Sequence, residues 1–272
     1  MTDNHPTPDR DRLSTLTALV FLTYALIRII SLPTLETEFV IFGVLIRLVL
    51  NTRLIILSVA ALITAAGADW LVRSHPAFQP GDSTLPHWIV PGMAALGTGG
   101  ILTRLPQGLA LWIGLPLGAL ILVGVLYAEF LVIDRRDDRF GMASIALRTL
   151  TYMLLAGSIF TLGATGQRAV YGVPVAFIAI FAATWRLELL EGRDRKASIL
   201  DAMVMGAIGA QILWAAHYWP ISPVRLALAI GLLVYLGNGL IDTFRHEPYS
   251  RGRVIEFTVL GLIGYGAIFA LT

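Results

Sequence analysis

Long apolar runs separated by short polar breaks dominate this sequence. Nine runs come close to the twenty or so mostly apolar residues that a helix needs to cross a bilayer, and charge-dense segments such as 134–139 and 191–196 lie between them. The nine expected spans are 13–32, 54–73, 88–104, 108–133, 142–163, 169–187, 198–218, 224–243 and 254–272. The pattern predicts an all-α fold: a polytopic transmembrane helical bundle of about nine spans, within a range of eight to ten. We expect one integral membrane domain over residues 1–272.

Three segments depart from this regular pattern. Residues 1–12 are polar and mixed in charge, and we expect them to form a cytoplasmic tail. Segment 39–50 is apolar but too short to cross, and joined to 54–73 it would give a helix of about 50 Å, well beyond the bilayer core. It is therefore expected to be interfacial or re-entrant. Run 88–104 contains Pro91 and four glycines, which predict a short span, either continuous or broken.

The composition supports a membrane protein. Hydrophobic residues make up 56% of the chain and charged residues 14%, with a mean hydropathy of +0.75. In soluble domains the hydrophobic fraction is about 45–50% and the charged fraction about 25%. These values exclude a soluble enzyme and a disordered chain. The absence of cysteine excludes disulfides, thiolate metal sites and a thiol nucleophile. The formal charge of +2 comes from basic residues in short loops, so we expect the lipid bilayer as a partner and no nucleic acid.

The placement of arginine and lysine predicts the orientation. Alternate loops carry 13 basic residues on one side and 5 on the other, with Arg28 and Arg148 inside spans. Cytoplasmic loops are enriched in these residues. The N-terminus is therefore predicted to be cytoplasmic and the C-terminus outside, in a multi-pass protein of the cell inner (plasma) membrane.

Most ionisable residues inside spans fall in the cytoplasmic half, with histidines just beyond them. Charges at bilayer depth are costly and usually face a cavity or a partner. Arg148 is the deepest, about 10 Å below the boundary, and its expected partner is Glu129 or Asp69. The alternatives are a polar pocket open to the cytoplasm, or snorkelling and helix-end capping. The candidate polar cluster comprises Asp69, Arg73, His75, His87, Glu129, Arg148, Asn238, Asp242 and Glu256.

One face of the eighth run carries Tyr235, Asn238 and Asp242 at positions i, i+3 and i+7. The neighbouring Gly237 and Gly239 would allow another backbone to approach. This face could contact a substrate or ion, or it could make an interhelical hydrogen bond at a seam of small residues.

Known catalytic motifs are absent from the sequence. It contains no Gly-x-Ser-x-Gly, no His-Glu-x-x-His and no Gly-Lys-Ser/Thr phosphate loop. We assign no catalytic, cofactor-binding or metal-binding residue and leave the cofactor open. A non-enzymatic protein is favoured over an enzyme.

Several short motifs resemble those of an uncharacterised bacterial family of multi-spanning membrane proteins. They are the segment 67–76 (GADWLVRSHP), His87-Trp88 with Pro91, Ala128-Glu129-Phe130, and Glu256-Phe257 in the C-terminal hairpin. The resemblance implies a helical integral membrane protein of unknown function and carries no catalytic role. It singles out Asp69, Arg73, His75 and His87, of which Asp69 and Arg73 are spaced i, i+4 and could pair.

Three functions are compatible with these patterns. The first is an accessory, assembly or scaffold subunit that packs against other membrane protein subunits. The second is a small-solute or ion-coupled transporter with a cytoplasm-facing polar site. The third is an enzyme acting on a lipid at the inner leaflet through Asp69, His75 and His87.

Overall fold

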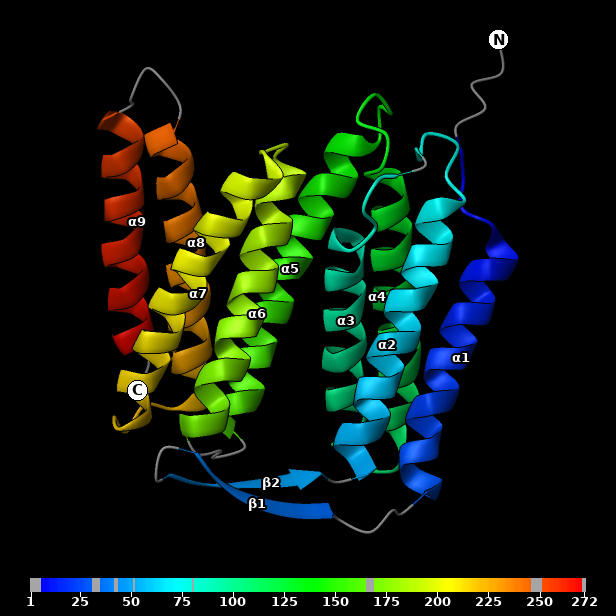
Figure 1. Ribbon diagram of the computed structural model, residues 1–272, viewed down its shortest axis with the longest axis horizontal. Helices are drawn as coiled ribbons and strands as arrows, with labels where there is room; N and C mark the ends of the chain where they lie inside the picture. The colour runs from blue at the N-terminus through cyan, green and yellow to red at the C-terminus, as the bar shows by residue number, and fades with distance from the viewer. Residues whose placement is uncertain are drawn as a thin grey trace. The chain divides into compact units, whose positions relative to one another are not determined.

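The computed structural model is built mainly of helices, with one small sheet (Figure 1). It describes residues 6–30, 35–41, 44–50, 52–79, 81–164, 169–245 and 251–270. In these ranges there are nine helices: α1 (Arg10–Ile29), α2 (Thr52–Arg73), α3 (Pro86–Leu102), α4 (Leu109–Leu131), α5 (Phe140–Ala164), α6 (Ala169–Leu190), α7 (Arg195–His217), α8 (Pro223–Arg245) and α9 (Arg251–Ala270). The predominantly helical class is confirmed.

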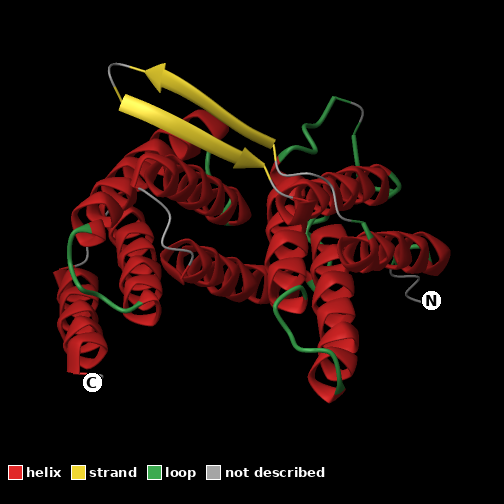
Figure 2. Ribbon diagram, turned by 90° about the horizontal axis from the view of Figure 1, so that it is seen from below, coloured by secondary structure: helices red, strands yellow, loops and turns green. Residues whose placement is uncertain are grey.

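The prediction of an all-α chain is wrong for the segment between α1 and α2. Strands β1 (Leu35–Ile41) and β2 (Val44–Leu50) pair antiparallel there, with Leu35 opposite Leu50 (Figure 2). The sequence explains this pairing, because Glu36 and Glu38 alternate with uncharged side chains, and valine, isoleucine and phenylalanine favour a pleated strand. Segment 39–50 is therefore most of a β-hairpin.

Among the residues that the structure describes, seven helices are long and apolar enough to cross a membrane. They are α2 (over Ile55–Arg73), α4, α5, α6, α7, α8 and α9. This supports a multi-pass membrane protein. Helix α1 and helix α3 are outside this set; the 17 residues of α3 extend about 26 Å, less than the roughly 30 Å hydrocarbon core. Nine crossings therefore stay a prediction.

Helix α3 is continuous, so a broken third span is excluded. Pro91 lies in its second turn, where it removes a single backbone hydrogen bond. The glycines serve close packing: a Cβ on Gly99 would come within 2.5 Å of both Leu57 and Tyr24. The position thus allows α3 to approach α1 and α2.

The chain forms two compact units, Met1–Leu147 and Arg148–Thr272, and α5 contributes to both. In the first unit α2 packs against α1, α3 and α4 around the buried residues Leu71, Leu122, Leu126 and Phe130. In the second unit α7 packs against α6 and α8, and α8 against α9, around Ile180, Met205, Leu213 and Ile230. Each unit therefore has its own apolar core.

Candidate functional site

In the first unit, polar side chains gather where α2 ends and α3 begins. The expected pair forms, with Arg73 Nε donating to Asp69 Oδ2 at 2.7 Å. The Thr84 hydroxyl donates to the other carboxylate oxygen, and Trp88 also donates to Asp69. Through these hydrogen bonds Asp69 holds the connection between α2 and α3 against the end of α2.

A second pair connects α3 to the end of α4. His87 Nδ1 and Glu129 Oε2 lie 2.7 Å apart, and only 1% of the Glu129 side chain is exposed. His87 is thus joined to the end of α4, while the hydrogen bonds of Asp69 described above come from Arg73, Thr84 and Trp88.

His75 is buried in the connection that follows α2. Its Nδ1 accepts a hydrogen bond from the Ala77 amide at 3.1 Å, and its ring meets Phe130 edge-on, with centroids 4.5 Å apart. Nε2 has no hydrogen-bond partner among the described residues. Burial lowers the pKa of His75, and the carboxylates of Asp134 and Asp137 offset only part of this effect. His75 is thus held in its neutral form near pH 7.

In the second unit, Arg193 is the centre of a charged network. Its guanidinium lies 2.6 Å from Glu188, 2.6 Å from Asp242, 3.3 Å from Glu191 and 3.8 Å from Asp201. The exposed fraction is 11% for the Arg193 side chain and 1% for that of Glu188. Burial alone would lower the pKa of Arg193, but the carboxylates of Glu188, Asp242 and Glu191 raise it above its ordinary value. The charged guanidinium therefore compensates a buried carboxylate.

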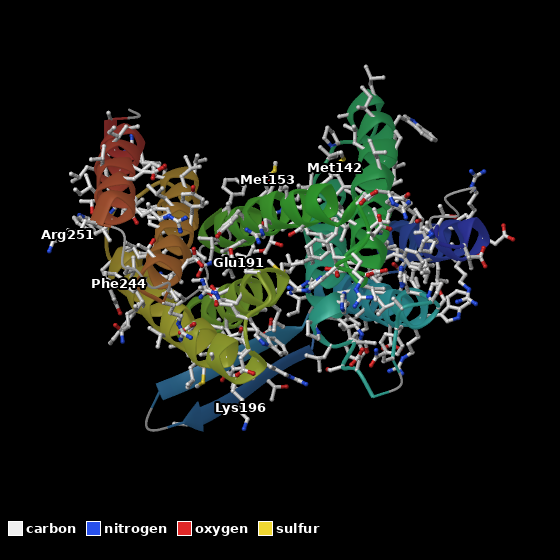
Figure 3. All side chains as sticks on the ribbon, turned by 90° about the horizontal axis from the view of Figure 1, so that it is seen from above. Met142, Met153, Glu191, Lys196, Phe244 and Arg251 are labelled. Carbon is white, nitrogen blue, oxygen red and sulfur yellow. The ribbon has the colours of Figure 1, made fainter. Side chains whose placement is uncertain are left out.

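Three more arginines extend the network. Arg245 pairs with Asp201 at 2.6 Å, Arg148 with Glu191 at 3.1 Å, and Arg253 with Asp242 at 3.7 Å. In Figure 3 Glu191 lies among the side chains between the helices of the second unit, whereas Lys196 and Arg251 point away from these helices. The members are the four arginines 148, 193, 245 and 253 and the four acids 188, 191, 201 and 242, so the formal charges cancel. The network connects α5, α6, α7, α8 and α9.

The structure gives Arg148 a partner that the sequence did not predict. Arg148 pairs with Glu191, which follows α6, whereas the expected partners were Glu129 and Asp69. Those two acids belong to the first unit and bind His87 and Arg73 there. The pair is also less buried than expected, since 39% of the Arg148 side chain is exposed.

Sequence reasoning missed Glu188 and the central role of Arg193. The sequence feature that could have revealed this pair is the glycine at the end of α6. Gly192 has φ 85°, its amide donates to the Leu189 carbonyl, and the Arg193 amide donates to the Glu188 carbonyl. This is the Schellman arrangement, which brings the residue after the glycine back beside the last helical turn. Glu188 and Arg193 occupy the two positions that this motif brings together.

Asn238 forms an interhelical hydrogen bond, which was one of the two alternatives predicted for the face of α8 that carries Tyr235, Asn238 and Asp242. Its Nδ2 donates to the Tyr152 hydroxyl at 3.4 Å, and the Tyr152 ring meets Tyr235 edge-on. Asn238 Oδ1 is buried without a hydrogen-bond partner among the described residues. Asn238 lies one turn from Asp242, about 6 Å further into the span. Glu256 is exposed and makes no ion pair with the described residues, so the structure does not bring it to the network.

Comparison with known proteins assigns the chain to a family. The family described as "Protein of unknown function (DUF5656)" matches residues 31–271. The chain belongs to this family. The DUF5656 match includes the hairpin, helices α2 to α9 and both polar groups, and it begins after α1. No curated protein and no solved structure matches the chain. The expected resemblance to an uncharacterised multi-spanning family is confirmed, while a bacterial source stays a prediction.

Proposed function

We propose that this DUF5656 protein is an accessory, assembly or scaffold subunit that packs against other membrane proteins. The observation that carries the proposal is the use of its ionisable groups: the charged residues at the helix ends bind one another. Arg193 binds Glu188 and Asp242, and Glu129 binds His87. Such pairs hold helices together, because removing one partner leaves an uncompensated charge.

The outer faces of the helices support the same proposal. Only 11% of the apolar window of α9 is buried within the chain, against 50% for α6. The exposed side chains of α9 include Ile255, Val259, Leu262 and Ile263, which share one side at helical spacing. Such a face contacts lipid or another membrane helix.

We further propose the inner (plasma) membrane, with the N-terminus cytoplasmic and a single integral membrane domain over 1–272. The support is the excess of arginine at one set of helix ends, 13 basic residues against 5. In this orientation the Arg193 network and the His87–Glu129 pair lie at the cytoplasmic ends of their helices.

Photo-crosslinking in intact cells tests the subunit proposal. A photoreactive amino acid replaces Leu262 on α9, Leu120 on α4 or Ile145 on α5, which are all well exposed. Buried Leu122 on α4 serves as the matched control. We expect one helix face to give a discrete protein adduct that the control does not give. Adducts with lipid alone at every exposed position, together with a monomeric protein in native mass spectrometry, would contradict the proposal.

A transporter is the second candidate, and the amide of Asn238 favours it. This amide is buried, its oxygen accepts no hydrogen bond from the part of the chain that the structure describes, and it lies one turn deeper than Asp242 of the charged network. In the cysteine-free chain, Asn238→Cys should react with an impermeant thiol reagent from the cytoplasmic side if water reaches this depth. Protection equal to that of Val234→Cys, a fully buried position one turn away, would argue against a transport path.

A further inference from the structure

The two faces of the β1–β2 hairpin carry different residues. Successive residues of a strand belong to opposite faces, and the register joins the faces of both strands. The first face holds Leu35, Thr37, Phe39, Ile41, Val44, Ile46, Leu48 and Leu50, with no ionisable residue. The second holds Glu36, Glu38, Val40, Leu45, Arg47 and Val49, with Glu38 opposite Arg47. The hairpin is thus amphipathic.

Exposure is described for four residues of the hairpin, one of them on the apolar face. Thr37 belongs to the apolar face, and Glu36, Glu38 and Val40 belong to the charged face; all four residues are exposed. A two-stranded hairpin by itself is at best marginally stable in water. A surface that covers the apolar face would therefore stabilise the hairpin.

We infer that this surface is the lipid bilayer, and that the hairpin lies flat on the membrane at the Thr52 end of α2. Strand β2 ends at Leu50 and α2 begins at Thr52, with the membrane-span candidate starting at Ile55. The end of β2 is therefore held at the membrane boundary. From there the apolar face meets the lipid, and Glu36, Glu38 and Arg47 belong to the face turned toward water.

The backbone edges of the hairpin limit how deeply it can enter the membrane. In a two-stranded sheet each strand has one unpaired edge of backbone amides and carbonyls. Open sheet edges do not occur in lipid-exposed hydrocarbon, because each unsatisfied group costs several kcal/mol there. Headgroups and water can satisfy these groups at the interface. Of the two expectations for segment 39–50, this argument selects an interfacial position over a re-entrant one.

Spin labelling tests the inference, and the chain has no cysteine that would interfere. Single cysteines replace Leu45, Ile46, Leu48 and Val49 in the full-length protein, which is then labelled and reconstituted in lipid nanodiscs. The four positions are aliphatic and alternate between the faces, so neighbours are matched controls. Collision with oxygen reports lipid, and collision with a water-soluble nickel complex reports water. We expect a severalfold higher oxygen-to-nickel ratio at 46 and 48 than at 45 and 49.

Three results would overturn the inference. Equal ratios at all four positions would mean that no single face meets the membrane. High oxygen access at all four positions would mean that the segment enters the hydrocarbon. Positions 46 and 48 shielded from both reagents, with spin–spin broadening that disappears on dilution with unlabelled protein, would mean that a second copy covers the face. The inference does not depend on the proposed subunit function, so either can fail alone.

Discussion

Arg193 is the residue whose loss should cost the second unit most. Arg193→Gln leaves Glu188, with 1% of its side chain exposed, without its 2.6 Å partner. Removing one member of a buried ion pair typically costs about 3–5 kcal/mol. We therefore expect a marked fall in thermal stability, measured by tryptophan fluorescence in lipid nanodiscs.

Two further variants separate this effect from a general loss of charge. Arg253→Gln removes an arginine that is 56% exposed and 3.7 Å from Asp242, and it should cost about 1 kcal/mol or less. The double variant Glu188→Gln with Arg193→Gln removes both charges and should recover part of the lost stability. Equal losses for Arg193→Gln and Arg253→Gln would contradict the central position of Arg193.

His75 should make the stability depend on pH. Its pKa in the folded chain is lowered by burial, so the unfolded chain binds the proton more readily. The stabilisation is complete above the ordinary histidine value of about 6.5 and is lost as the pH falls from that value toward the lowered pKa. Melting temperatures between pH 8 and pH 5 should therefore fall more steeply for the native chain than for His75→Asn. Asparagine keeps an acceptor for the Ala77 amide and cannot become cationic; equal slopes would refute the assignment.

At the scale of elements, Gly99 determines how closely three helices of the first unit approach. A methyl group there would meet the Tyr24 ring, which cannot easily move because its hydroxyl donates to the Ala95 carbonyl at 2.6 Å. Gly99→Ala should therefore cost about 1–3 kcal/mol. At the adjacent Gly100 a Cβ meets nothing within 4 Å. Gly100→Ala should be neutral or stabilising by up to about 1 kcal/mol. Similar melting temperatures for the two variants would argue against this packing.

The same scale explains why the sequence predicted the helices correctly but did not predict the strands between α1 and α2. A span is a local property, since some twenty apolar residues must satisfy their backbone within one helix. Segment 39–50 was too short for this rule, and the strand pairing of Leu35 with Leu50 depends on a partner fifteen residues away. Likewise the glycines of 88–104 suggested a break, whereas contacts with Leu57 and Tyr24 give Gly99 a packing role.

At the scale of the whole molecule, orientation is the property that can be tested directly. Ser74 follows α2 and Ser222 precedes α8, and both are exposed. Five helices lie between them, so the two should be on opposite sides. Ser222→Cys should react with an impermeant maleimide in intact cells, and Ser74→Cys only after the membrane is opened. The reverse pattern would invert the proposed topology, and reaction of both in intact cells would change the number of crossings.

The sequence by itself determined the class of the protein and the places where its charges lie. Hydropathy over a window of twenty residues is summed locally, so membrane helices can be recognised without knowing their neighbours. The sequence also predicted the Asp69–Arg73 pair, because residues four apart meet on one helix. The partners of Arg148, His87 and Glu188 depend instead on which helix ends come together. Only the tertiary structure decided these contacts, because they join positions from different elements whose separation along the chain gives no information about their distance in space.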